Sequence, residues 1–218
     1  MRNLSSKQIY FQWRCMGNTA YFPFIIGIIL TVYCSFLHGN VKYMVPALEM
    51  TLPAMSAWWS IFLLQDSLEE EGSETLFTYP SARWILFLPV ILFFFVVYAL
   101  FIMILLFTIL IINNQISGYF PLLFQLGIES FFFVCLGFLS MVLTRNVSWA
   151  LYVIAAYTSF QIITKGVYLP SINIYIFNDT ILSLNDKRLL GSSIKSLILS
   201  FIIMIVAQTI LNKTEKFK

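Results

Sequence analysis

The chain has 218 residues, of which 60% are hydrophobic and only 11% are charged, and its mean hydropathy is +0.86. A soluble domain carries about 25% charged residues, so this composition excludes an ordinary soluble fold and predicts an all-α integral membrane protein. The net charge of +3 is too small to indicate a nucleic-acid partner, and we expect none.

Ahead of the first long apolar run, the segment 7–16 mixes Tyr10 and Trp13 with Lys7 and Arg14. Aromatic side chains favour the membrane interface, and basic ones favour anionic headgroups. Two interpretations stay open for this segment, an interfacial helix on the cytoplasmic face and an irregular tail.

Six apolar runs follow that are long enough to cross a membrane, which takes about 20 helical residues each. We expect one transmembrane domain over 1–218, with an N-terminal segment at 1–20, a cytoplasmic loop at 65–83 and an extracellular loop at 170–193. The outer loop is too short and polar to span twice, so a short re-entrant or surface helical pair is expected there. The six expected spans are 21–37, 43–64, 84–112, 119–142, 148–169 and 194–211.

Lysine and arginine predict the orientation of these spans. With the N-terminus inside, eight basic residues lie on the cytoplasmic side and four lie outside. Both termini and the loop 65–83 are then cytoplasmic. We expect a multi-pass protein of the cell membrane, and the residue usage is typical of a low-GC bacterium.

The motifs of common enzyme classes do not occur in this sequence. There is no phosphate-binding G-x-x-x-x-G-K-[ST] loop, no H-E-x-x-H and no G-x-S-x-G. The single histidine, His38, cannot build a metal site alone, and the three cysteines follow no metal or redox spacing. We therefore expect no catalytic residue, no metal and no cofactor on this chain, and no enzymatic activity of its own.

Five of the ten acidic residues lie in the loop 65–83, between the second and third expected spans. Acidic side chains favour the first turn of a helix. Gly72 interrupts the stretch, and Pro80 ends whatever helix precedes it. The pattern predicts a short, acidic, amphipathic helix at the cytoplasmic mouth, which is an element that a partner's groove can hold.

The order Glu-Glu-Gly, several apolar positions, Tyr-Pro-Ser-x-Arg and then a span resembles the membrane subunits of type-2 ABC exporters. The resemblance covers the whole chain in topology and this loop in motif. The matching residues are Glu70, Glu71, Gly72, Leu76, Tyr79, Pro80, Ser81 and Arg83.

The resemblance implies a coupling helix that docks on a separate ABC ATPase subunit, which would bind ATP and Mg. It also implies a second permease copy or a paralogue, in membrane lipid, and export of a peptide, lipid-like or drug-like amphipathic substrate. The alternative is a non-transporting membrane immunity or assembly protein. The residues expected to bind the ATPase are Glu70, Glu71, Gly72, Glu74, Leu76, Phe77, Tyr79, Pro80 and Arg83.

Three ionisable residues, Glu49, Glu129 and Lys165, fall within expected spans. Each costs about 2.5–3.5 kcal/mol on insertion scales unless it is paired or hydrated. Glu49 and Lys165 lie at matching depth and predict a pair, while Gln125 lies one turn before Glu129 on the same helix face. These residues either line a translocation path or tie the helices together, and the sequence leaves both interpretations open.

Overall fold

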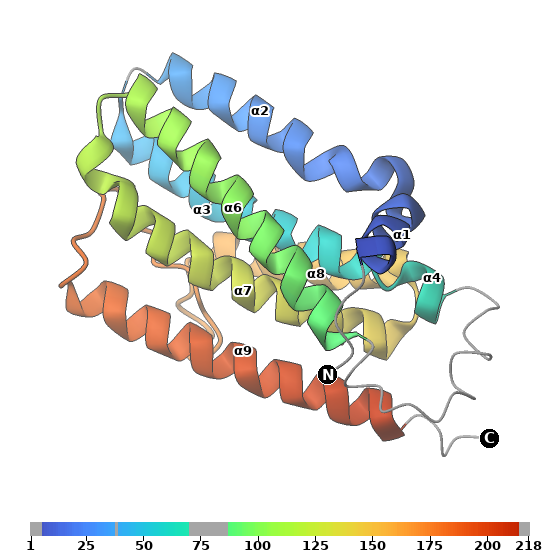
Figure 1. Cartoon of the computed structure of the whole chain (residues 1–218). Helices are drawn as coiled ribbons and strands as arrows, with labels where there is room; N and C mark the ends of the chain where they lie inside the picture. The colour runs from blue at the N-terminus through green and yellow to red at the C-terminus, as the bar shows by residue number, and fades with distance from the viewer. Residues whose placement is uncertain (1–5, 38, 70–86, 214–218) are drawn as a thin grey trace.

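The structure is a computed structural model that describes residues 6–37, 39–69 and 87–213. Over these residues the chain is all-helical and forms no strand (Figure 1). The helices are α1 (Ser6–Met16), η1 (Gly17–Tyr21), α2 (Phe22–Phe36), α3 (Val41–Phe62), α4 (Gln65–Leu68), α6 (Leu88–Ile112), η3 (Ile116–Gly118), α7 (Tyr119–Thr144), α8 (Val147–Thr164) and α9 (Lys187–Lys213).

Five helical segments of the described chain are long and apolar enough to cross a membrane, by length and composition. The first, Ile9–Phe36, joins α1, η1 and α2, and the third, Ile116–Thr144, joins η3 and α7. The other three are α6, α8 and α9. These segments are compatible with a multi-pass membrane protein, as the composition predicts.

The helix α3, which we expected as the second span, has the length for crossing but is not among these five segments. It contains Lys42, Glu49 and two internal prolines, Pro46 and Pro53. It contacts α2, α6, α7 and α8. A helix that other helices cover needs less apolar surface than one that faces lipid, because its polar groups find partners inside the bundle.

The helix α1 occupies the segment that we expected to be an interfacial helix. It leaves Tyr10 68% exposed. On the same helix, the Trp13 ring lies 5.7 Å from that of Trp59 and 6.2 Å from that of Phe94, measured between centroids. The irregular-tail interpretation is therefore wrong for residues 6–16.

The turn between α7 and α8 combines the two usual signals of a helix end and a helix start. Arg145 follows α7 with a left-handed φ of +50°, the conformation that commonly ends a helix. The Asn146 side chain then accepts a hydrogen bond from the Trp149 N–H at 3.2 Å and caps α8. This turn therefore holds the two helices in a defined relation.

The connection between α8 and α9 enters the bundle without forming a helix (Figure 1). Ile174 and Tyr175 in this connection are 0% and 3% exposed. We name it the re-entrant connection because it folds into the helix bundle, and our expectation of a helical pair within 170–193 is wrong. Four of its residues bond through their backbone to side chains of α3, α8 and α9 instead, namely Ile172, Ile174, Ile176 and Phe177.

The helix α9 begins at Lys187, seven residues before the expected start of the last span at 194. The Asp186 side chain accepts a hydrogen bond from the Arg188 N–H at 2.8 Å and satisfies a donor of the first turn. Hydropathy locates only the apolar part of a helix, and the polar first turns of α9 extend beyond that part. The expected loop 170–193 was therefore too long at its C-terminal end.

The helices α3 and α7 pack closely because small residues lie between them. A Cβ atom at Gly137 would come within 3.0 Å of the Ala57 carbonyl oxygen and even nearer to Ser60 Oγ. The Ser56 hydroxyl donates to the Ser130 carbonyl oxygen at 2.7 Å across the same interface. Close approach of small residues is a common way to join helices in membranes.

We expect Gly137→Ala to destabilise the bundle, because the new methyl group would force α3 and α7 apart at a cost of about 1–3 kcal/mol. Gly127→Ala is the matched control, since a Cβ atom there meets nothing within 4 Å and alanine favours the helix. Thermal unfolding in lipid nanodiscs measures both variants. Equal melting temperatures for the two would contradict the proposed interface.

Candidate functional site

A buried polar cluster lies where α3, α7, α8 and the re-entrant connection meet. Its members are Glu49, Gln125, Glu129, Tyr157 and Tyr175. Glu49 is 1% exposed and Glu129 is 2% exposed. Carboxyl groups are almost never so buried without partners, so the partners of these two groups define the site.

The Glu49 carboxyl group holds the re-entrant connection by accepting hydrogen bonds from the backbone of that connection. Its Oε1 atom accepts hydrogen bonds from the N–H groups of Ile176 and Phe177, the second at 3.2 Å. Phe177 has a left-handed φ of +51°, which is uncommon for a residue other than glycine. Successive N–H groups beside a left-handed residue form a concavity that binds anions. Glu49 therefore fills an anion site made by the connection itself.

Glu129 meets Glu49 from the neighbouring helix. The Gln125 Nε2 atom donates to Glu129 Oε1 at 3.1 Å, as the spacing along α7 predicts. The two carboxyl groups lie close enough to interact. The Oε2 atom of each is buried and has no hydrogen-bonding partner. The structure thus brings together Glu49, Gln125 and Glu129.

Lys165 lies outside this cluster, and our expectation of a Glu49–Lys165 pair is wrong. The helix α8 ends at Thr164, and Lys165 follows as an exposed residue with a left-handed φ of +48°. Glu49 has the two N–H donors and Glu129 in its place. Across the described chain, neither carboxyl group of the cluster meets a basic side chain.

Further contacts fasten the connection to α8 and α9. Tyr157 on α8 donates its hydroxyl to the Ile172 carbonyl oxygen at 2.9 Å. Ser192 on α9 donates to the Ile174 carbonyl oxygen at 3.1 Å. Burial, and secondarily the nearby Glu129 carboxyl group, raises the pKa of the Tyr175 hydroxyl. The connection is therefore held as part of the core.

A second polar contact lies at the opposite end of α8, and the sequence analysis missed it. Glu69 Oε1 accepts from Asn146 Nδ2 at 2.9 Å, and Glu69 Oε2 accepts from the Val147 N–H at 3.3 Å. Glu69 follows the short helix α4, at the entrance to the acidic loop. The available signal was an asparagine with helix-capping chemistry at 146, but nothing in the sequence pairs it with Glu69.

Only the start of the acidic loop, through Glu69, belongs to the described residues. The expected coupling helix and its contacts with an ATPase therefore remain predictions. The expected ATPase-binding residues that lie outside the described chain are Glu70, Glu71, Gly72, Glu74, Leu76, Phe77, Tyr79, Pro80 and Arg83.

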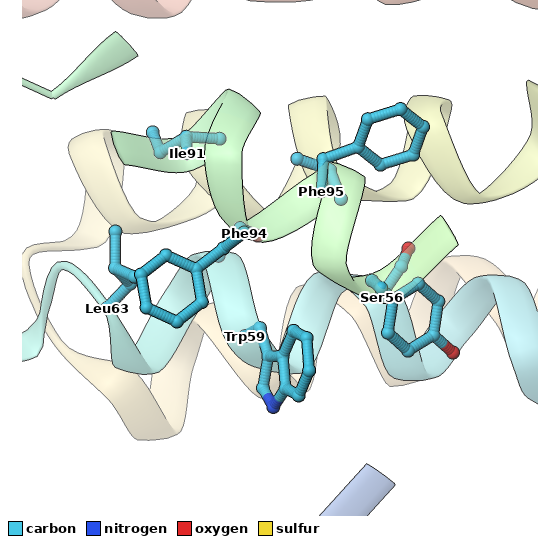
Figure 2. Close-up of a pocket in the computed structure, with 9 residues that line it drawn as sticks. Ser56, Trp59, Leu63, Ile91, Phe94 and Phe95 are labelled. Atoms are coloured by element: carbon cyan, nitrogen blue, oxygen red, sulfur yellow. The ribbon is translucent and has the colours of Figure 1, made fainter. Parts of the chain in front are cut away.

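A small cavity of about 10 Å³ lies between α3, α6 and α7 (Figure 2). Trp59, Phe94 and Phe95 line it together with the polar Ser56. This volume is about that of one water-sized probe. This cavity is too small for a substrate.

No group of three or more histidine, cysteine, aspartate or glutamate residues in the described chain is arranged to hold a metal ion. Comparison of the chain with protein-family models, curated proteins and solved structures finds no match in any of the three. The architecture alone therefore defines the class. The chain is a helical protein with several membrane-length apolar segments around a buried carboxyl cluster.

We expect Glu49→Ala to release the re-entrant connection, because two part-buried N–H groups would lose their acceptor, at a cost of up to about 1–3 kcal/mol for each group. Glu49→Gln keeps one acceptor oxygen and should have a smaller effect. Hydrogen exchange of amides 174–177 at constant pH measures the release. Asp179→Asn, which changes an exposed acidic residue of the same connection, is the control. Unchanged exchange in Glu49→Ala would contradict the proposed anchor.

Proposed function

We propose that this chain is the membrane-spanning subunit of an ATP-driven exporter that works with a separate ABC ATPase subunit. The absence of a phosphate-binding loop from the sequence supports a separate energy source. The helix order also supports the proposal, with an N-terminal helix, two helical hairpins and a re-entrant connection before the last helix.

The contact between Glu69 and the start of α8 carries the proposal. An ATPase that grips the acidic loop must transmit its movement to the membrane helices. Glu69 lies at the loop entrance and bonds the α7–α8 turn through Asn146. At its other end, α8 holds the re-entrant connection through Tyr157. A displacement of the loop would therefore reach the buried cluster through one rigid helix.

In this proposal α3 is the sixth membrane-crossing helix, covered by its neighbours rather than by lipid. Six crossings would leave both termini on one side, which we propose to be the cytoplasmic side. The ATPase would supply ATP and Mg, and a second permease copy or a paralogue would complete the transporter. The buried cluster would tie α3, α7 and the re-entrant connection in this conformation.

The exported substrate would be an amphipathic molecule of the peptide, lipid-like or drug-like kind. The apolar surfaces of the membrane-length helices support an apolar substrate portion. The cluster around Glu49 and Glu129 would supply polar contacts only after the helices move apart, because it is closed in this structure.

We expect the chain to co-purify with an ATP-hydrolysing subunit, and Glu70→Lys combined with Glu71→Lys to abolish that association. Reversing these charges would remove the acidic face of the loop that the partner is proposed to hold. Asp179→Lys, on the re-entrant connection, is the control and should retain the ATPase. The measurement is co-purification followed by an ATPase assay and mass spectrometry. Absence of any ATPase from the wild-type complex would favour the non-transporting immunity or assembly protein.

We expect Glu69→Ala to keep the ATPase bound but to reduce transport at least severalfold, because the link from the loop to α8 would be lost. The measurement compares substrate export and ATP hydrolysis in proteoliposomes, with Glu69→Gln as a variant that keeps one acceptor oxygen. Full export by Glu69→Ala would contradict the proposed transmission through α8.

A further inference from the structure

We propose that Glu49 and Glu129 form a proton-binding site, in which one shared proton locks the re-entrant connection into the bundle. The proposal concerns the ligand of the buried cluster and does not depend on the partner ATPase. It rests on two buried carboxyl groups from different helices, each with an unpartnered oxygen atom, and on the hydrogen bonds that surround them.

The first observation is that each carboxyl group has one buried oxygen atom without a hydrogen-bonding partner. These are Glu49 Oε2 and Glu129 Oε2. The two groups lie close enough to interact. Two adjacent carboxylates inside a bundle repel and lack hydration, so they cannot both be ionised. A single proton shared between the two carboxyl groups would provide a missing donor and remove one charge.

The hydrogen bonds also indicate which group carries that proton. Glu49 accepts two backbone N–H bonds, which favour its ionised form. Glu129 accepts only one side-chain bond, from Gln125. In the locked state Glu129 would therefore donate its proton to the ionised Glu49, and Glu49 would remain the anion that the connection surrounds.

The other titratable groups around the pair do not replace the proton. Tyr157 on α8 and Tyr175 on the connection lie near Glu129. Both are neutral phenols at ordinary pH. Lys195 on α9 donates instead to the Pro170 carbonyl oxygen at 2.9 Å. Within the described residues the charge of the pair is therefore balanced by hydrogen bonds and by the shared proton.

Loss of the shared proton to water would leave two carboxylates in contact. Their repulsion would favour an open arrangement in which Glu49 and the connection separate from Glu129 and become hydrated. Proton release and opening of the connection would then be linked, so that the open fraction rises as the pH rises. Gain of a second proton would neutralise Glu49 and weaken the two hydrogen bonds that it accepts from backbone N–H groups. The locked state would therefore lose stability at low pH as well.

Infrared difference spectroscopy tests for the shared proton directly. We expect a protonated-carboxyl C=O band in the wild type that shifts in D2O. Either Glu129→Gln or Glu49→Gln should remove the whole band, because an amide can donate the bond in place of the proton. Asp179→Asn should leave the band unchanged. Absence of the band from the wild type, or loss of only part of it in each variant, would overturn the proposal.

Hydrogen exchange of amides 174–177 tests the lock. The wild-type rate is divided by the Glu129→Gln rate at each pH, so that the intrinsic pH dependence of exchange cancels. We expect this ratio of exchange rates to stay constant at pH values where the shared proton is bound. Above the pH at which that proton dissociates, the ratio should rise about tenfold per pH unit, which is the slope for release of one proton. A ratio independent of pH would overturn the lock. A ratio that responds to Na⁺ instead of pH would identify a metal-cation site and also overturn it.

Discussion

The rest of the structure depends on the burial of the Glu49 carboxyl group. Insertion of a carboxylate among apolar helices costs several kcal/mol unless hydrogen bonds replace its hydration. Here the replacement comes from the backbone of the connection between α8 and α9. The connection must therefore enter the bundle, and its entry explains why Ile174 and Tyr175 are buried although they belong to no helix.

The same constraint explains the composition of α3. A helix that carries Glu49 and two prolines cannot face lipid at low cost, so it is covered by α2, α6, α7 and α8. Its close contact with α7 needs small residues, which Gly137 and Ala57 provide. That contact in turn brings Glu129 to Glu49. The carboxyl pair is thus a consequence of how α3 is packed.

The helix α8 joins the two polar regions of the described chain. Its first turn is bonded to Glu69 and its last turns hold the connection through Tyr157. A proton at the carboxyl pair and a partner at the acidic loop would therefore act on the same helix from opposite ends. Proton release and ATP-driven movement would then be coupled through α8.

The amino-acid sequence by itself determined the all-helical class, the presence of several membrane-length apolar helices and the Gln125–Glu129 contact. These follow from composition and from spacing within one helix, both of which are local properties. Only the tertiary structure decided the partner of Glu49. Backbone N–H groups have no sequence signature, and those of Ile176 and Phe177 lie 127 and 128 residues away. The same reason explains the incorrect Glu49–Lys165 pair, since matching depth in two helices does not say which faces meet. Contact between helices far apart in the sequence depends on packing of the whole bundle, and the sequence pattern of any single helix does not contain it.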